Sequence, residues 1–402
     1  MQVAIHDFEK ARRKRARKRT LRRLTVLVCI CALVLIIIGI QGLLSSIPIM
    51  DMIRSTVSLT GKTGSYPIAV PDSTIYDVYR LKNNVLLKTD SDLYIYNRDG
   101  KEVLSVWHGM SDPAVDVAGD YLLYYVVGGD KVTVQSIYGS SKTIEVDNML
   151  LKAYASENGN VLVYSMSKNN IYYLEAYNSK QERIFHMRIQ ESHVLNVSFT
   201  PDQQGVLVIS FRAENGVMIS RLSRYNFNQT SVGEGEDKWV SVEPIFQVEF
   251  ADTFLQAAAY HGDTIIAVAE TRCLFLNNIG EIQKEYQYGG LPLDNFDIET
   301  QDGAVLLFAD YGASFTSSTL VSLDRHGDVR YAKAFDSHVD PMFVTSSVTY
   351  TLVDRVIEWY NISGEYQGKL ELEDNVSDFI VIGGSAYLVG PRQLQKMELK
   401  GG

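Results

Sequence analysis

Two hydrophobic patterns divide the chain. The first is one almost unbroken apolar run from Leu24 to Leu44, interrupted late by Gln41. The second begins near residue 66 and consists of many short runs, apolar or alternating, bounded by Gly, Asn and Asp. A helix of about 20 apolar residues crosses the hydrocarbon core of a bilayer, whereas short runs between turn residues are typical of strands. We therefore predict a transmembrane helix over 24–44, bounded by Leu24 and Leu44, and an all-β domain after it.

The residues ahead of the apolar run are strongly basic, and only Asp7 and Glu9 oppose them. The basic residues are Lys10, Arg12, Arg13, Lys14, Arg15, Arg17, Lys18, Arg19, Arg22 and Arg23. Because positive charge beside a transmembrane helix stays in the cytoplasm, we expect 1–23 to be a cytoplasmic tail whose partner is the lipid bilayer. No aromatic residue lies among the basic ones, so nucleic acid is not expected as a partner.

Cleavage of this segment as a signal peptide is the alternative. A signal peptide has an apolar stretch of about 7–15 residues followed by small residues at the cut site. Here the run is longer and no Ala-x-Ala pattern follows it. An uncleaved anchor is therefore favoured, with 45–65 as a short stalk and 66–402 on the far side of the membrane.

A turn followed directly by an apolar strand recurs eight times after the stalk. The strands of this mark are 85–87, 121–124, 161–163, 206–209, 264–266, 304–307, 348–350 and 386–389. Most copies are followed by a second strand and a tight turn such as Asn361-Ile362-Ser363-Gly364, and Asn and Gly supply the backbone angles of hairpin turns. A unit of about 40 to 45 residues with four strands is the size of one β-propeller blade.

The two ends of the domain complement each other. The eighth unit offers three strands before the chain stops, and Tyr66 to Val70 can supply the fourth. Such pairing removes the exposed edge of an open array. We predict an eight-bladed β-propeller closed by strand 66–70 and tethered to one N-terminal transmembrane helix. Seven blades, or two smaller β domains, stay open because the fourth unit is longer than the others.

The excess length of the fourth unit is expected around 226–243, which is polar, acidic and contains one tryptophan. Aromatic residues are enriched at binding hot spots, so Glu236, Asp237 and Trp239 are the candidate contact with a partner. The alternative is a solvated loop whose tryptophan packs back onto its blade.

Charge and cysteine content limit the ligands and the cellular compartment that we expect for the domain. The formal net charge is −10, and the first 44 residues carry a surplus of eight positive charges, which leaves −18 for the rest. Such an acidic domain is not expected to bind nucleic acid. Cys273 is the one cysteine beyond the anchor, so no disulfide can form within the exported part. A large, cysteine-poor exported domain fits a bacterial envelope.

Motifs of known catalytic and cofactor sites are absent from the sequence. There is no Gly-x-Ser-x-Gly, no His-Glu-x-x-His, no Cys-x-x-Cys, no phosphate loop and no EF-hand loop. The histidines beyond the tail are spread over separate units: His108, His186, His193, His261, His326 and His338. Their convergence on a central channel is the remaining route to a metal or general-base site. We therefore assign no catalytic, metal or cofactor residue.

The layout of basic tail, single span and propeller with Asn-x-x-Gly hairpins resembles a family of uncharacterised single-pass bacterial membrane propeller proteins, a domain-of-unknown-function family. The resemblance covers nearly all 402 residues and rests on layout. It implies an envelope location and carries no catalytic residues. The eight-bladed lipoprotein of the outer-membrane barrel assembly machinery is similar in layout, but no lipidated Cys follows the apolar run here.

The expected function is therefore that of a non-enzymatic scaffold. It would bind an envelope protein or a wall polymer on the outer side of the cytoplasmic membrane, in a bacterium of the Gram-positive type. The alternative is a propeller hydrolase or lyase that acts on cell-envelope glycans through carboxylates or histidines in the channel. A sensor is a third possibility, which the short cytoplasmic tail disfavours.

Overall fold

The computed structural model describes residues 64–70, 74–189, 192–228, 242–311, 316–373, 376–390 and 392–399. The predicted tail 1–23, the transmembrane segment 24–44 and most of the stalk lie outside these ranges, as do Glu236, Asp237 and Trp239. Within the described ranges, no helix is long and apolar enough to span a bilayer.

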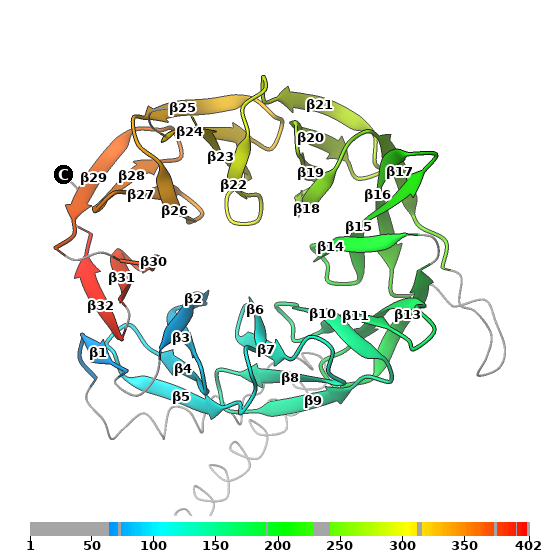
Figure 1. Ribbon diagram of the computed structural model, residues 1–402, viewed down its shortest axis with the longest axis horizontal. Coiled ribbons are helices and arrows are strands. Elements are labelled where there is room, and N and C mark those ends of the chain that lie inside the picture. The colour runs from blue at the N-terminus through cyan, green and yellow to red at the C-terminus, as the bar shows by residue number, and fades with distance from the viewer. Residues whose placement is uncertain are drawn as a thin grey trace, which may run out of the picture. The chain divides into compact units, whose positions relative to one another are not determined.

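Eight antiparallel sheets of four strands each follow one another around a ring (Figure 1). We number these sheets as blades 1 to 8 along the chain. Blade 1 consists of β2 (Ile75–Leu81), β3 (Asn84–Thr89), β4 (Asp92–Tyr96) and β5 (Glu102–Trp107), and blade 2 consists of β6 (Ala114–Ala118), β7 (Tyr121–Tyr125), β8 (Lys131–Ser136) and β9 (Ser141–Glu145). Blade 3 consists of β10 (Met149–Ala155), β11 (Val161–Met166), β12 (Tyr172–Tyr177) and β13 (Arg183–Ile189), and blade 4 consists of β14 (His193–Phe199), β15 (Gly205–Glu214), β16 (Val217–Asn226) and β17 (Phe246–Ala251). Blade 5 consists of β18 (Leu255–His261), β19 (Thr264–Ala269), β20 (Arg272–Asn277) and β21 (Ile282–Gln287), and blade 6 consists of β22 (Leu293–Asp297), β23 (Gly303–Tyr311), β24 (Thr316–Asp324) and β25 (Val329–Phe335). Blade 7 consists of β26 (Val339–Val344), β27 (Val348–Val353), β28 (Val356–Asn361) and β29 (Tyr366–Glu371), and blade 8 consists of β30 (Asp378–Ile382), β31 (Ser385–Gly390), β32 (Gln393–Glu398) and β1 (Ile68–Ala69).

The core of the ring lies between the blades. Each of the eight hydrophobic clusters joins two neighbouring blades. On β19, for example, Ile265 packs toward blade 4 while Ile266 packs toward blade 6. The second strand of each blade is thus covered by side chains on both of its faces. This explains why it appears in the sequence as a continuous apolar run rather than an alternating one.

Blade 8 combines both ends of the propeller. Its inner three strands come from the C-terminal end, and β1 pairs antiparallel with β32 through Ile68 opposite Leu394 and Ala69 opposite Gln393. The segment expected to close the ring, 66–70, therefore contains the outermost strand of blade 8. Tyr66 supports this join, because its hydroxyl donates to the carbonyl of Asn97 in blade 1 at 3.0 Å.

The prediction of an eight-bladed propeller is confirmed, and the alternatives of seven blades or two β domains are wrong. All eight apolar runs singled out in the sequence are second strands. The account of the longer fourth unit needs a correction. Part of its excess lies in β15 and β16, which have 10 residues each, and not only around 226–243.

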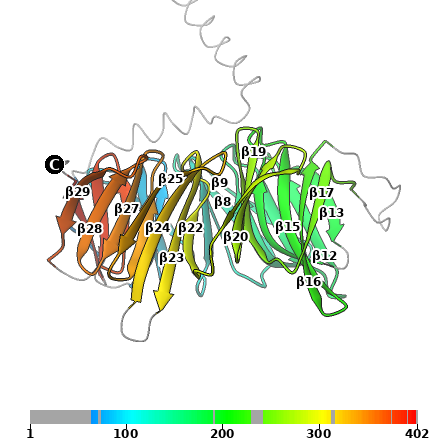
Figure 2. The ribbon, with the colours of Figure 1, turned by 90° about the horizontal axis from the view of Figure 1, so that it is seen from above.

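The ring has two faces that differ in their loops. The entry face carries the turns that follow first and third strands, and there Ser65 lies against Gly100 as the described chain enters the propeller. The hairpin face carries the turns between second and third strands and the connections between blades. Figure 2 shows two hairpins, β15–β16 and β23–β24, that project beyond the other blades on this face.

Turns on the entry face repeat one hydrogen-bonded design. In blade 7 the side-chain oxygen of Asn361 accepts from the backbone N–H of Ser363 and of Glu365 at 3.0 and 2.9 Å. In blade 5 the side-chain oxygen of Asn277 accepts from Ile279 and Glu281 in the same way. Gly364 then takes a left-handed φ of +80°. This design confirms the hairpin turns predicted from Asn-x-x-Gly.

Candidate functional site

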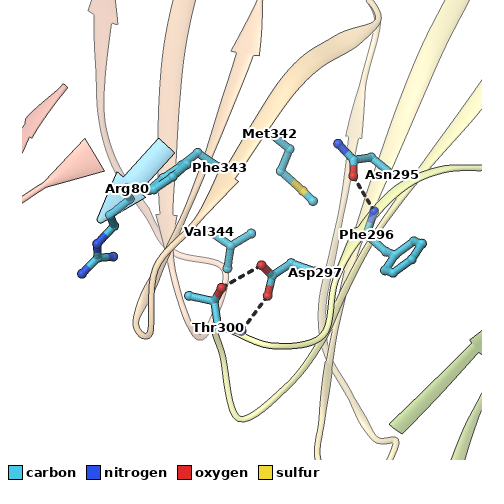
Figure 3. A pocket seen from close by; sticks show the side chains of 8 residues that line it. All are labelled: Arg80, Asn295, Phe296, Asp297, Thr300, Met342, Phe343 and Val344. Carbon is cyan, nitrogen blue, oxygen red and sulfur yellow. Dashed lines mark hydrogen bonds between the residues drawn. The ribbon is translucent and has the colours of Figure 1, made fainter. Parts of the chain in front are cut away.

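A cavity of about 290 Å³ lies near the axis of the ring, where first strands run into the turns of the entry face. Its lining residues come from blades 1, 6 and 7 (Figure 3) and are Arg80, Asn295, Phe296, Asp297, Thr300, Met342, Phe343 and Val344. We call this the axial cavity. One guanidinium and one carboxylate thus share a small space with an apolar wall.

Asp297 is held in a fixed orientation in the axial cavity. Its carboxylate accepts from the backbone N–H and the hydroxyl of Thr300 at 2.9 and 2.7 Å, as Figure 3 shows. Arg80 is positioned by its Nε, which donates to the carbonyl of Lys82 at 3.2 Å. Among the described residues, neither Arg80 nor Asp297 takes part in an ion pair.

Further carboxylates on or beside the innermost strands have raised pKa values. Burial raises the pKa of Asp378 to about 6, and the nearby negative charges of Asp77 and Asp340 add to this effect. Glu299 is exposed at the surface, yet the protein around it desolvates its carboxyl and raises its pKa, with Asp297 and Asp116 as lesser causes. These interactions connect acidic groups from several blades. The axis of the ring is therefore an acidic environment in which a carboxyl can hold its proton more readily than in water.

A larger groove, about 570 Å³, lies on the hairpin face between blades 3 and 4. Its lining residues are Asn170, Ile171, Tyr172, Arg188, Ile189, Ser192, His193, Arg212 and Ala213. They belong to the turn before β12, the end of β13, the start of β14 and the projecting part of β15. We call this the blade 3/4 groove.

Arg212 is held in place at the wall of the groove by two carboxylates. Its guanidinium donates to Glu249 at 2.8 Å and to Glu214 at 3.1 Å. Arg221 donates to the same Glu249 at 2.7 Å. The hydrogen bonds from Arg212 and Arg221 lower the pKa of Glu249 to about 2. The projecting hairpin is thereby tied to β17, so the groove wall is preorganised.

Aromatic rings line the other side of the groove. The ring of His193 meets Tyr172 edge-on with centroids 5.1 Å apart and lies 5.6 Å from Phe211. Tyr172 in turn stacks on Tyr164 at 5.7 Å. Because the rings of His193 and Tyr172 pack against further rings, they form a rigid, amphipathic surface next to Arg188 and Arg212. Such a combination suits contacts with a peptide or a sugar.

The histidines do not converge on the axis. His186 on β13 has its Nδ1 2.8 Å from the carboxylate of Glu175. His261 contacts the carbonyl of Ile298 through Nε2 at 2.6 Å, and His108 is buried beside Thr89. His326 lies in a turn of the entry face, and the Nε2 of His338 is 3.9 Å from Asp294. The possibility that the sequence left open, a histidine site in the channel, is therefore not supported by the contacts of these five histidines.

No metal site is evident in the described part of the chain. Within it, no group of three or more His, Cys, Asp or Glu residues could hold an ion. Cys273 is fully buried, and burial raises the pKa of its thiol, so it is a core residue.

The predicted contact residues Glu236, Asp237 and Trp239 remain a prediction because they lie outside the described residues. Of the two tryptophans within the described ranges, Trp107 at the end of β5 is exposed, with 76% of its surface accessible, and Trp359 is buried. Sequence reasoning also missed the blade 3/4 groove. Asn215-Gly216, at the tip of the projecting hairpin, was an available signal because Asn-Gly favours a two-residue hairpin turn.

Comparison with known proteins supports the architecture. The model of the family described as "Family of unknown function (DUF5711)" matches residues 62–399. No curated protein matches the chain. Among solved structures, the C-terminal WD40 domain of Sif2 is similar with a TM-score of 0.55 and 9% identity, over 85% of this chain and 100% of that one. Sqt1 from Chaetomium thermophilum has a TM-score of 0.51 and 10% identity, over 84% of this chain and 99% of that one. At these identities the likeness concerns the propeller fold alone.

Proposed function

The chain belongs to the DUF5711 family of unknown function, and we propose that it is a membrane-anchored propeller that binds a protein or a polymer of the cell envelope. Its anchor would be 24–44, its tail 1–23 would stay in the cytoplasm, and its propeller would lie outside the cytoplasmic membrane of a Gram-positive type of bacterium. The apolar run and the basic residues ahead of it support this topology.

The blade 3/4 groove carries the binding part of the proposal. It is the larger of the two cavities described above, it lies beside a projecting hairpin, and it combines arginines with backed aromatic rings. Arginine, tyrosine and tryptophan dominate the energetics of protein interfaces. Ser65, near the start of the described residues, lies against Gly100 on the opposite face.

A pull-down of the full-length protein from native membranes tests the groove. The variant His193→Ala/Ala213→Glu changes two groove positions, and Arg355→Glu changes an exposed position on the hairpin face of blade 7. We expect crosslinked envelope partners with the wild type and the blade 7 variant, and their loss with the groove variant. Equal recovery with both variants contradicts a role of the groove.

Thiol labelling of intact cells tests the topology. Ser363→Cys introduces an exposed thiol on the propeller, whereas Ala11→Cys lies in the predicted tail. Cys273 is buried and does not react. A membrane-impermeant maleimide should label the first variant and not the second. Labelling of the second variant alone would place the propeller in the cytoplasm.

A hydrolase or lyase of envelope glycans is the second candidate, and the axial carboxylates favour it. A carboxyl with a pKa of about 6, such as Asp378, can hold a proton near neutral pH and act as a general acid. Purified full-length protein and its Asp378→Asn variant, incubated with cell-wall fragments, test this candidate. Release of new sugar ends by the wild type but not the variant supports an enzyme, and no release from either rejects it.

A further inference from the structure

We propose that the axial cavity binds a small zwitterion with an apolar side chain, that is, a free amino acid or a dipeptide. The cavity is distinct from the blade 3/4 groove and lies nearer the opposite face. The inference rests on the kinds of groups that share the axial cavity and on the interactions that these groups make.

The charges in the cavity have opposite signs. Arg80 comes from blade 1, and Asp297 comes from blade 6. In Figure 3 the two side chains lie on opposite sides of Val344. Within the described part of the chain, neither one is neutralised by an ion pair. A ligand that carries a carboxylate and an ammonium group would satisfy both, with guanidinium to carboxylate and carboxylate to ammonium.

Asp297 is already oriented for such a contact. Its hydrogen bonds from Thr300, and a longer one of 3.3 Å from the backbone N–H of Glu299, use most of the acceptor capacity of the carboxylate and fix its plane. An ionised carboxylate can accept about four hydrogen bonds in all, so about one acceptor position remains for an ammonium group. Preorganisation of this kind lowers the entropic cost of binding.

The rest of the lining fits the apolar part of the ligand. Phe296, Met342, Phe343 and Val344 form the apolar wall. A volume of about 290 Å³ is at the small end of the range of ligand sites and suits an amino acid better than a polymer. Glu299, in the turn after β22, lies near enough to Asp297 for the charge of Asp297 to affect its pKa, and it adds a further acidic group that favours a ligand with a positive charge.

Calorimetric titration of the full-length protein in detergent micelles tests the proposal with defined probes. L-leucine and L-leucyl-L-leucine are the two zwitterions, and they distinguish an amino acid site from a dipeptide site. N-acetyl-L-leucine lacks the ammonium group and L-leucinamide lacks the carboxylate. We expect one of the zwitterions to bind the wild type. Both blocked analogues should bind at least about tenfold more weakly, because each lacks one charge-assisted hydrogen bond.

Two variants assign the charges to residues. Arg80→Gln should weaken the zwitterion about tenfold while leaving L-leucinamide unchanged, because the amide has no carboxylate to lose. Asp297→Asn keeps an acceptor for Thr300 and should weaken the zwitterion while leaving N-acetyl-L-leucine unchanged. Arg325→Gln and Asp354→Asn, both in turns away from the cavity, are the matched controls and should bind as the wild type does.

Two results would overturn the proposal. One is the absence of heat from either zwitterion with the wild type. The other is binding that Arg80→Gln and Asp297→Asn leave unchanged. Because the analogue tests use the wild-type protein, they remain decisive even if one variant folds poorly.

Discussion

Ile68 and Leu394 lie opposite each other in the antiparallel pair that joins the two ends of the propeller. Ile68 belongs to the first described strand and Leu394 to the last. Leu394 is also fully buried in the cluster shared by blades 8 and 1. The integrity of the ring therefore depends on a contact between segments that are far apart in the sequence.

Removal of the Leu394 side chain should weaken this closure. We expect Leu394→Ala to lower the free energy of unfolding by about 2–5 kcal/mol, as for other large-to-small changes in a packed core. Arg392→Ala, at an exposed position just before the same strand, is the control and should change stability little. Denaturant unfolding measures both, and equal stability of the two variants would show that the pairing does not hold the ring closed.

Gly364, in a turn of blade 7, lies close to the ring of Tyr331 in blade 6. A Cβ at this position would lie 2.4 Å from Cγ of Tyr331 on β25. At Gly384, where φ is also near +80°, a Cβ would meet nothing within 4 Å. Alanine at either position is strained in a left-handed backbone conformation, which lowers the free energy of unfolding by about 1–2 kcal/mol. Only Gly364→Ala adds a steric clash, which lowers it further by about 1–3 kcal/mol. Thermal unfolding should therefore show a clearly lower Tm for Gly364→Ala than for Gly384→Ala.

Asp378 should make the propeller less stable as the pH rises. Its pKa is about 6 in the folded protein against an ordinary value of 3.8, mainly because of burial. The protonated form is thus favoured by folding, and this contribution to stability is full below about pH 4 and lost as the pH rises through 6. We expect Asp378→Asn to raise the Tm relative to wild type at pH 7.5 and to match it at pH 4. A constant difference at both pH values would show that Asp378 does not titrate in this range.

Glu249 should have the opposite pH dependence. Its hydrogen bonds from Arg212 and Arg221 lower its pKa to about 2 from an ordinary 4.5. The ionised form is favoured by folding, so its contribution is present above about pH 4.5 and is lost as the pH falls toward 2. Glu249→Gln should therefore have a lower Tm than wild type at pH 7, with a difference that shrinks at pH 3. A difference that persists unchanged at pH 3 would contradict this assignment.

Most of the architecture could be predicted from the sequence because the blades repeat one physical arrangement. Each second strand is buried between two neighbouring blades and must be apolar along its whole length, as in Val206 to Ile209. Turns such as that of Asn361 follow at a constant offset, since the same side-chain hydrogen bonds shape them. A repeated signal of this kind defines the blades and their number.

The candidate sites could not be predicted in the same way. Arg80 and Asp297 are separated by most of the chain, and only ring closure brings blades 1 and 6 around one cavity. In the blade 3/4 groove, His193 and Arg212 come from ordinary strand ends that carry no motif. Convergence depends on the curvature and order of the ring, which a pattern along one chain does not specify.

Site-specific photocrosslinking in intact cells tests the central claim, binding at the blade 3/4 groove, most directly. A photoreactive amino acid is placed at Ala213 in the groove or at Arg355 on the hairpin face of blade 7. We predict a discrete adduct with an envelope protein or polymer from position 213 and none from position 355. The same adducts from both positions, or none from position 213, would contradict the assignment of the groove as the binding surface.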